Sequence, residues 1–375
     1  MSKFPNVSTT IFTIMSQLAK EHQAINLSQG FPNFPVDERL KSSVVKWAKE
    51  EIHQYLPMAG FPPLLEKIAI LTQTSYHQKV NPATDILITA GATEGIFASI
   101  QALVNQGEEV IILDPSYDCY ETPILLCNAK PIRINLNDDF TPNWEAIGNA
   151  MNSKTRMIIT NNPHNPTGKI WIENDFIQLE RLLDLYPNII VLSDEVYEYI
   201  TFENKHISVH HRPKLWDRSI VVSSFGKSFH ITGWKIGYLI ASEYLMSEIK
   251  KVHQYLVFSV NSIAQYAIND FMDVVNVSEL GKFYQQKRDF FRNLLQETKF
   301  ELLPCEGSYF QIASYASISN ATDLEFTKRL VKEFGVATIP LSPFYADAKQ
   351  TKCIRFCFAK EETTLQKAAE RLLKL

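Results

Sequence analysis

The sequence contains no apolar run close to the roughly 18 residues that a membrane-spanning helix needs. Its first residues have no apolar core either, so we expect no secretory leader. Positive charge is not in excess, because 37 Lys and Arg stand against 41 Asp and Glu, for a formal net charge of −4. This balance gives no electrostatic reason to expect nucleic acid or a membrane as a partner. We expect a cytoplasmic protein of enzyme size.

Cysteine is scarce, and its spacing argues against disulfides and structural zinc. There are five cysteines, an odd number. Cys353 and Cys357 lie in one strand-like run, but no second pair of cysteines or histidines joins them, as a zinc site would require. Buried free thiols are the simpler interpretation. We therefore expect no metal site.

Two nucleotide-binding motifs are absent as well. No G-x-G-x-x-G occurs, which removes the main sequence support for a nicotinamide cofactor. Gly226-Lys227-Ser228 is similar to the end of a phosphate-binding P-loop, but position 221 is valine where that motif begins with glycine. The segment around Lys227 needs a different explanation.

What the sequence does contain is a regular alternation of apolar runs and helical patterns. Its apolar content of 45% is typical of a folded protein, and 375 residues exceed one ordinary core, so we expect two domains. The alternation predicts an α/β fold with a mostly parallel central sheet covered by helices. The strand-like runs of this sheet are residues 86–89, 110–113, 156–160, 189–192, 220–223 and 238–241.

The pattern of apolar runs and helical segments changes along the chain and divides it into three segments. Residues 1–36 form an N-terminal arm with a short helix at 11–22, residues 37–270 the large domain, and residues 271–375 a smaller α+β domain that the arm joins. In the small domain we expect helices at 280–295 and 363–375 and short strands at 300–303, 309–312, 336–339 and 354–358.

Distinctive side chains follow most of the predicted large-domain strands. Ligands of open α/β sheets bind at the carboxyl ends of the strands, so we expect these side chains to share one edge. Each has an ordinary alternative: a strand-to-helix turn for residues 91–93, packing for Tyr117, a rigid turn for Asn165 and a helix cap for Asp194. Tyr197 and Lys227 complete the series.

Together these groups match the needs of pyridoxal 5′-phosphate (PLP). A lysine binds its aldehyde as a Schiff base, an acid keeps the ring nitrogen protonated, and a phenol and an amide bind the ring oxygen. A helix N-terminus binds the phosphate. We expect Lys227 to form the Schiff base and Lys235 to help hold the phosphate. The other predicted members are Gly91, Ala92, Thr93, Tyr117, Asn165, Asp194 and Tyr197.

From Thr10 to Leu375 the chain resembles the fold-type I, PLP-dependent class I/II aminotransferases. Within them it is most similar to the bacterial methionine aminotransferases and to the kynurenine aminotransferase–glutamine transaminase group. The resemblance implies ping-pong transfer of an amino group from an amino acid to a 2-oxo acid, in a homodimer with shared active sites. It rests on segments 9–12, 26–32, 162–166, 193–197, 223–227, 232–235 and 354–358.

The resemblance also implies roles for individual residues. Lys227 would be the Schiff-base lysine and the base that moves the Cα proton, with Asp194 and Tyr197 as the other catalytic residues. Arg355 would bind the substrate α-carboxylate. The assisting residues would be Gly30 and Asn165 for the carboxylate, Tyr117 for the ring, and Gly91, Ala92, Thr93, Ser224, Lys235 and the partner subunit's Tyr55 for the phosphate.

The side-chain pocket implied by the resemblance is aromatic and contains no second arginine, which favours methionine or another apolar or aromatic amino acid over aspartate. Phe12 stands where kynurenine-type enzymes carry tryptophan, and Ser259 where they carry histidine, so methionine is a better expectation than kynurenine. Lys235 stands where many members carry arginine, but the kynurenine-type branch shares this lysine. The expected pocket residues are Phe12, Phe31, Tyr55 and Phe258.

Other activities remain open on the same residues. A PLP-dependent cysteine-conjugate C–S β-lyase needs the same lysine and only a leaving group at Cβ, and kynurenine or glutamine transamination is a further alternative. A ligand-sensing domain of a transcriptional regulator is less consistent, since the resemblance begins near residue 10 and the net charge is −4.

Overall fold

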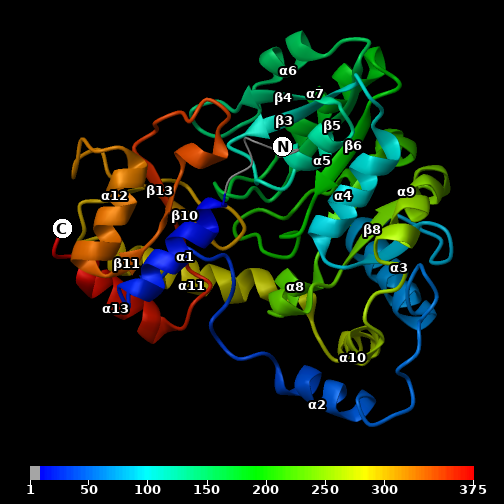
Figure 1. The fold of residues 1–375 in the computed structure, drawn as a ribbon, viewed down its shortest axis with the longest axis horizontal. Helices are drawn as coiled ribbons and strands as arrows, with labels where there is room; N and C mark the ends of the chain where they lie inside the picture. Colours follow the sequence, from blue (N-terminus) through cyan, green and yellow to red (C-terminus); the bar gives the residue numbers. More distant parts are fainter. Residues whose placement is uncertain (1–8) are drawn as a thin grey trace, which may run out of the picture.

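The computed structural model describes residues 9–375 and is built around a seven-stranded sheet (Figure 1). The strand order is β2-β8-β7-β6-β5-β3-β4, in which β8 runs antiparallel to both neighbours and all other pairs are parallel. The mostly parallel central sheet is therefore confirmed. Its strands are β2 (Ile86–Thr89), β3 (Glu109–Asp114), β4 (Lys130–Asn135), β5 (Thr155–Asn161), β6 (Ile190–Asp194), β7 (Ser219–Ser223) and β8 (Gly237–Ala241).

Six of these strands were predicted within two residues, and the seventh, β4, was missed. β4 pairs only with β3 and forms one edge of the sheet. Lys130 and Asn135 are exposed, and Ile134 is its one buried residue. An edge strand of this kind has no continuous apolar run, so the pattern that reveals the buried strands is absent.

The buried strands are apolar along their length because helices cover both faces of the sheet. Val110 and Ile112 of β3 pack in the same cluster as α4 (Ala92–Leu103), whereas Ile111 and Leu113 pack with α7 (Glu173–Leu185). Successive side chains of a strand point to opposite faces, so both layers are apolar. The other helices of this part are α2 (Glu38–Trp47), α3 (Pro62–Tyr76), α5 (Glu121–Leu126), α6 (Trp144–Ala150), α9 (Glu243–Leu256) and α10 (Ser262–Met272).

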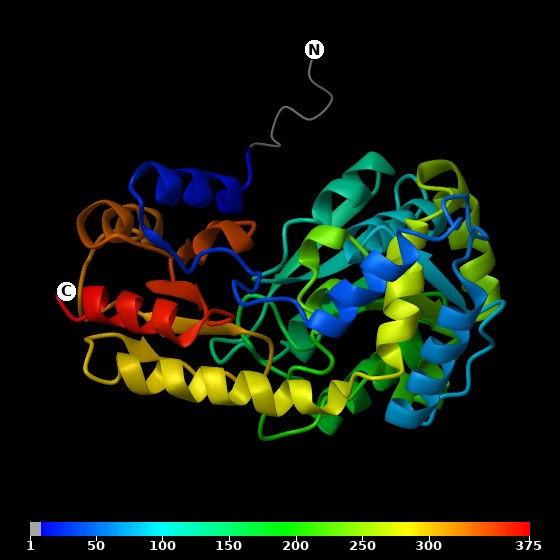
Figure 2. The ribbon, with the colours of Figure 1, turned by 90° about the horizontal axis from the view of Figure 1, so that it is seen from below.

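The last third of the chain forms a four-stranded antiparallel sheet in the order β12-β13-β10-β9. Figure 2 shows it with its helices beside the large sheet, with the long α11 running along one side. The two helices expected here form within three residues of their predicted ends. The elements are β9 (Glu301–Leu302), β10 (Phe310–Ser314), β12 (Ile339–Pro340), β13 (Cys353–Cys357), α11 (Leu280–Leu295), α12 (Asp323–Arg329) and α13 (Glu362–Leu372).

The N-terminal segment packs on this C-terminal part. α1 (Ile11–Glu21) buries Met15 and Ala19 in one apolar cluster with residues of β10 and β12. β1 (Ile25–Asn26) pairs in parallel with β11 (Val336–Ala337). The segment that follows β1 contacts both parts of the chain, because the Gly30 carbonyl accepts hydrogen bonds from Lys227 and from Tyr309. Among the described helices, none is long and apolar enough to cross a membrane.

Candidate active site

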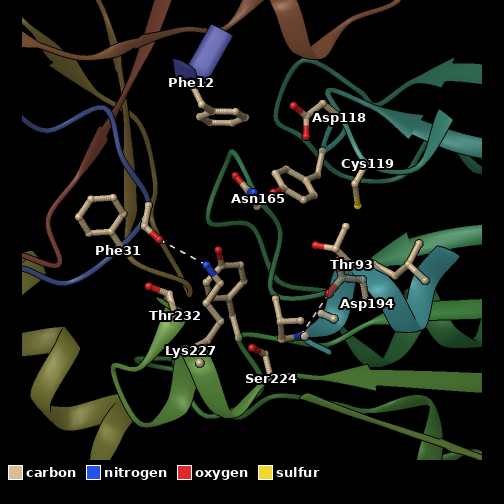
Figure 3. A pocket seen from close by; sticks show the side chains of 18 of the residues that line it. Phe12, Phe31, Thr93, Asp118, Cys119, Asn165, Asp194, Ser224, Lys227 and Thr232 are labelled. Atoms are coloured by element: carbon tan, nitrogen blue, oxygen red, sulfur yellow. Dashed lines mark hydrogen bonds between the residues drawn. The ribbon is translucent and has the colours of Figure 1, made fainter. Parts of the chain in front are cut away.

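The carboxyl ends of the parallel strands meet a cavity of about 630 Å³. β8 runs in the opposite direction, so residues just before it reach the same edge. The far side of the cavity is formed by α1, residues 29–31, β10 and β13. In Figure 3, Phe31 and Asp118 lie on opposite sides of this space and Phe12 lies above it.

All but two of the residues predicted for the site line this cavity, although they come from distant parts of the chain. Tyr55 and Phe258 do not line it. They are 81% and 45% exposed, and their rings meet edge to face with centroids 5.3 Å apart. The predicted residues that line the cavity are Phe12, Gly30, Phe31, Gly91, Ala92, Thr93, Tyr117, Asn165, Asp194, Tyr197, Ser224, Lys227, Lys235 and Arg355.

Lys227 lies on α8 (Phe225–Ser228), the single helical turn that follows β7. Its amine donates a hydrogen bond of 3.3 Å to the carbonyl of Gly30 (Figure 3). No described carboxylate lies within salt-bridge distance of it. Burial lowers the pKa of Lys227 to about 8. An amine that loses its proton this close to neutral pH can act as a nucleophile or a base.

Asp194, the last residue of β6, is 4% exposed and points into the same space. Its Oδ2 accepts a hydrogen bond of 2.6 Å from the Tyr120 hydroxyl, and its Oδ1 accepts one of 3.3 Å from the backbone of Val196. Burial raises its pKa to about 6. The alternative that Asp194 caps a helix through Tyr199 is wrong, because residues 196–199 form turns.

Arg355 of β13 is a buried guanidinium, 1% exposed. It donates to Oδ1 of Asn165 at 2.7 Å and to the carbonyl of Ser28 at 3.0 Å, while its Nε has no partner among the described residues. It lies 3.9 Å above the Phe310 ring. The structural ion pair that was the alternative for Arg355 does not form with any described carboxylate. A buried cation of this kind suits a bidentate carboxylate ligand.

Another part of the cavity lining has the features of an anion site. Gly91 precedes α4 with a φ of +80°, and a Cβ at this position would lie 3.3 Å from the Lys235 amine. The N-terminus of a 12-residue helix and a lysine amine therefore converge on one place. No described group accepts a hydrogen bond from that amine within bonding distance. Thr93 and Ser224 line the same region.

Several residues of the site were missed from the sequence. Asn161 accepts a hydrogen bond from the backbone of Asn165 at 2.7 Å and donates one to the Asp194 carbonyl at 2.9 Å, so it joins two strand ends. Tyr309 donates to the Gly30 carbonyl at 2.7 Å. Asn161 lies between the predicted strand at 156–160 and the segment at 162–166, so its place at a strand end was a usable signal, whereas Tyr309 carried none. Further lining residues are Thr10, Thr13, Gln29, Asp118, Cys119, Thr232 and Phe310.

Comparisons with known proteins agree with this geometry. The family model "Aminotransferase class I and II" matches residues 22–372. Methionine aminotransferase of Escherichia coli is 46% identical over 100% of this chain and 98% of its own length. Kynurenine–oxoglutarate transaminase of Dictyostelium discoideum is 33% identical over 98% of this chain and 94% of its own.

Solved structures give the same result. An E. coli protein whose crystal structure identified a methionine aminotransferase function superposes with a TM-score of 0.98 at 46% identity, over 100% of this chain and 99% of the other. N-succinyldiaminopimelate aminotransferase of Mycobacterium tuberculosis superposes with a TM-score of 0.95 at 31% identity, over 100% and 99% of the two chains.

Proposed function

The chain belongs to the class I and II aminotransferases, and from that premise we propose that it binds PLP in the cavity and transfers the amino group of methionine to a 2-oxo acid. One observation carries the proposal. The half-buried amine of Lys227 and the buried guanidinium of Arg355 line the same cavity, and neither is paired with a described carboxylate. Cofactor aldehyde and substrate carboxylate are the groups that such a pair would bind.

The residues around the cavity fit PLP, on which this family generally depends. The convergence of the α4 N-terminus and the Lys235 amine suits a phosphate, and the buried Asp194 suits a protonated ring nitrogen. When bound, PLP supplies an aldehyde and an electron-withdrawing ring that stabilises negative charge on the carbon beside the amino group. The residues that would hold it are Lys227, Asp194, Asn165, Tyr197, Tyr117, Gly91, Ala92, Thr93, Ser224 and Lys235.

The chain's own side chains would divide the work of the reaction. Arg355, with Asn165 and the backbone of Gly30, would bind the substrate α-carboxylate and so fix the orientation of Cα. Lys227 would take the proton from Cα and return it later, which a pKa of about 8 permits near neutral pH. The rings of Tyr197 and Tyr309 both lie 5.7 Å from the amine and make its surroundings less polar.

The cavity favours an uncharged substrate side chain. Phe12, Phe31 and Phe310 line it, and a thioether gains about 0.3–1.5 kcal/mol from each contact with an aromatic ring. Asp118 adds an exposed carboxylate to the lining, and no other described residue donates a hydrogen bond to it. Among the described lining residues Arg355 is the one arginine. A substrate γ-carboxylate would therefore be repelled by Asp118 and would have no second arginine to pair with.

Steady-state assays of the PLP-saturated protein test this function. We expect methionine to be consumed only when a 2-oxo acid is present, with kcat/KM well above that for glutamate. Asp118→Asn should raise the glutamate-to-methionine ratio of kcat/KM by about tenfold, because one repulsive charge is removed. Glutamate used as well as methionine by the unsubstituted protein would contradict the substrate class. Pyruvate and ammonia released from a cysteine conjugate without a 2-oxo acid would favour the β-lyase instead.

A further inference from the structure

Asp194 has a side-chain partner that does not line the cavity. Tyr120 is 3% exposed and follows β3 in the same loop as Tyr117, which does line it. The Tyr120 hydroxyl lies 2.6 Å from Oδ2 of Asp194. The backbone N–H of Val196 donates to the other oxygen. Among the described residues, these two groups are the donors to this carboxylate, and Tyr120 supplies the shorter bond.

We propose that Tyr120 is a positioning residue, which fixes the plane of the Asp194 carboxylate and holds it ionised where it would meet the cofactor ring nitrogen. Tyr120 does not line the cavity; its ring packs edge to face against Tyr117, and its hydroxyl would act on the site through Asp194. The inference rests on the proposed PLP site, but Asp194 can be studied in the cofactor-free chain without any transamination.

The electrostatic balance at Asp194 shows why a donor matters. Burial raises its pKa to about 6, whereas the hydrogen bonds from Tyr120 and Val196 and the charge of Lys227 act in the opposite direction. A donor to the charged form favours that form. Burial also raises the pKa of Tyr120, so its phenol keeps the proton that it donates. The ionisable groups around Asp194 are Tyr117, Cys119, Tyr120, Glu195, Tyr197, Lys227 and Lys235.

Tyr120→Phe tests the inference through the titration of Asp194 itself. In the cofactor-free full chain, labelled with ¹³C at aspartate carboxyls, the Asp194 signal is assigned by its loss in Asp194→Asn. Tyr120→Phe should raise its titration midpoint by about one pH unit, since a hydrogen bond to a charged group is lost. PLP affinity should fall about tenfold at neutral pH. The matched control is Tyr315→Phe, which removes a buried phenol that donates to the Ala321 carbonyl and does not line the cavity.

An Asp194 midpoint that is the same in Tyr120→Phe and in the unsubstituted protein would overturn the inference. Should Tyr120→Phe not fold, a titration of the unsubstituted chain still tests the role of Tyr120. Its Tyr120 ring signal, labelled with ¹³C at Cζ, should shift with the same midpoint as the Asp194 carboxyl. A Tyr120 signal that stays constant while Asp194 titrates would equally contradict the role. Neither result depends on whether methionine is a substrate.

Discussion

The half-buried Lys227 and the buried Arg355 are cations that the described part of the chain leaves without a carboxylate. Burying an unpaired charge costs several kcal/mol, so such residues are retained where a ligand completes them. Lys227 has its pKa lowered by burial, and the guanidinium of Arg355 keeps an Nε without a described partner. At the scale of single residues, the site is a set of groups that a cofactor and a substrate would satisfy.

Lys227→Met should stabilise the cofactor-free chain by about 2 kcal/mol at pH 7. The pKa of Lys227 falls from its ordinary 10.5 to about 8 on folding. The unfolded chain therefore binds the proton more tightly, and the penalty is full below pH 8 and disappears as the pH rises towards 10.5. The gain from Lys227→Met should shrink accordingly at pH 9.5. Urea unfolding at both pH values measures it.

The control for that experiment is Lys251→Met. Lys251 is an exposed lysine that pairs with Glu248 on the surface of α9, and its loss should change the free energy of unfolding by less than about 0.5 kcal/mol. A Lys227→Met variant less stable than the unsubstituted chain at pH 7 would show that the Lys227 amine is not an unpaired charge that destabilises the fold.

At the scale of elements, six of the seven strands of the large sheet could be predicted because burial on both faces makes them continuously apolar, which the edge strand β4 is not. The carboxyl ends of these strands could be predicted too, and with them the residues that gather at one edge of the sheet. The contacts between loops could not. Tyr309 reaches Gly30 across 279 residues, and Tyr120 meets Asp194 across 74. No periodicity in the sequence reveals which two loops come together, so only the structure shows these two contacts.

Gly91→Ala tests the N-terminus of α4 as the phosphate site. An added Cβ would crowd the Lys235 amine at 3.3 Å, so PLP affinity should fall about tenfold, or about 1.4 kcal/mol. Gly107→Ala is a matched control, because Gly107 has a φ of +81° against +80° for Gly91 but no heavy atom within 4 Å of its added Cβ. Gly91→Ala should cost about 1–3 kcal/mol of stability, because φ +80° with ψ 165° is a backbone region that other residues rarely adopt, and Gly107→Ala about 1 kcal/mol. PLP titration should separate them, and equal affinities would place the phosphate elsewhere.

At the scale of the whole molecule, the cavity lies between two sheets and needs both ends of the chain. Lys227 and Asp194 come from the large sheet, Arg355 from β13, and Phe12 from α1, which packs on the C-terminal part. The division at residues 36 and 270 stays a prediction, as does the homodimer. Tyr55 and Phe258 are the two predicted site residues outside the cavity, and a partner subunit is the expected place for their role.

Mixing two impaired variants tests the shared site. If Tyr55 serves the neighbouring subunit, Lys227→Ala and Tyr55→Ala chains unfolded and refolded together should form hybrids with one intact site. Transaminase activity should then exceed the sum of the separate variants. Tyr244→Ala removes another exposed tyrosine, 71% exposed on α9, and should leave PLP affinity unchanged. Shared sites would be ruled out if light scattering shows a monomer, or if the activity of the mixture equals the sum of the activities of the two variants.

The visible absorbance of the PLP-saturated protein, followed as methionine and then a 2-oxo acid are added, tests the central claim most directly. The spectrum of the bound cofactor should change on adding methionine, with release of one equivalent of its 2-oxo acid, and should return when the second 2-oxo acid is added. Lys227→Ala should bind PLP but not complete this cycle. A PLP-bound protein whose spectrum does not respond to methionine, or a Lys227→Ala variant that cycles like the unsubstituted protein, would contradict the account.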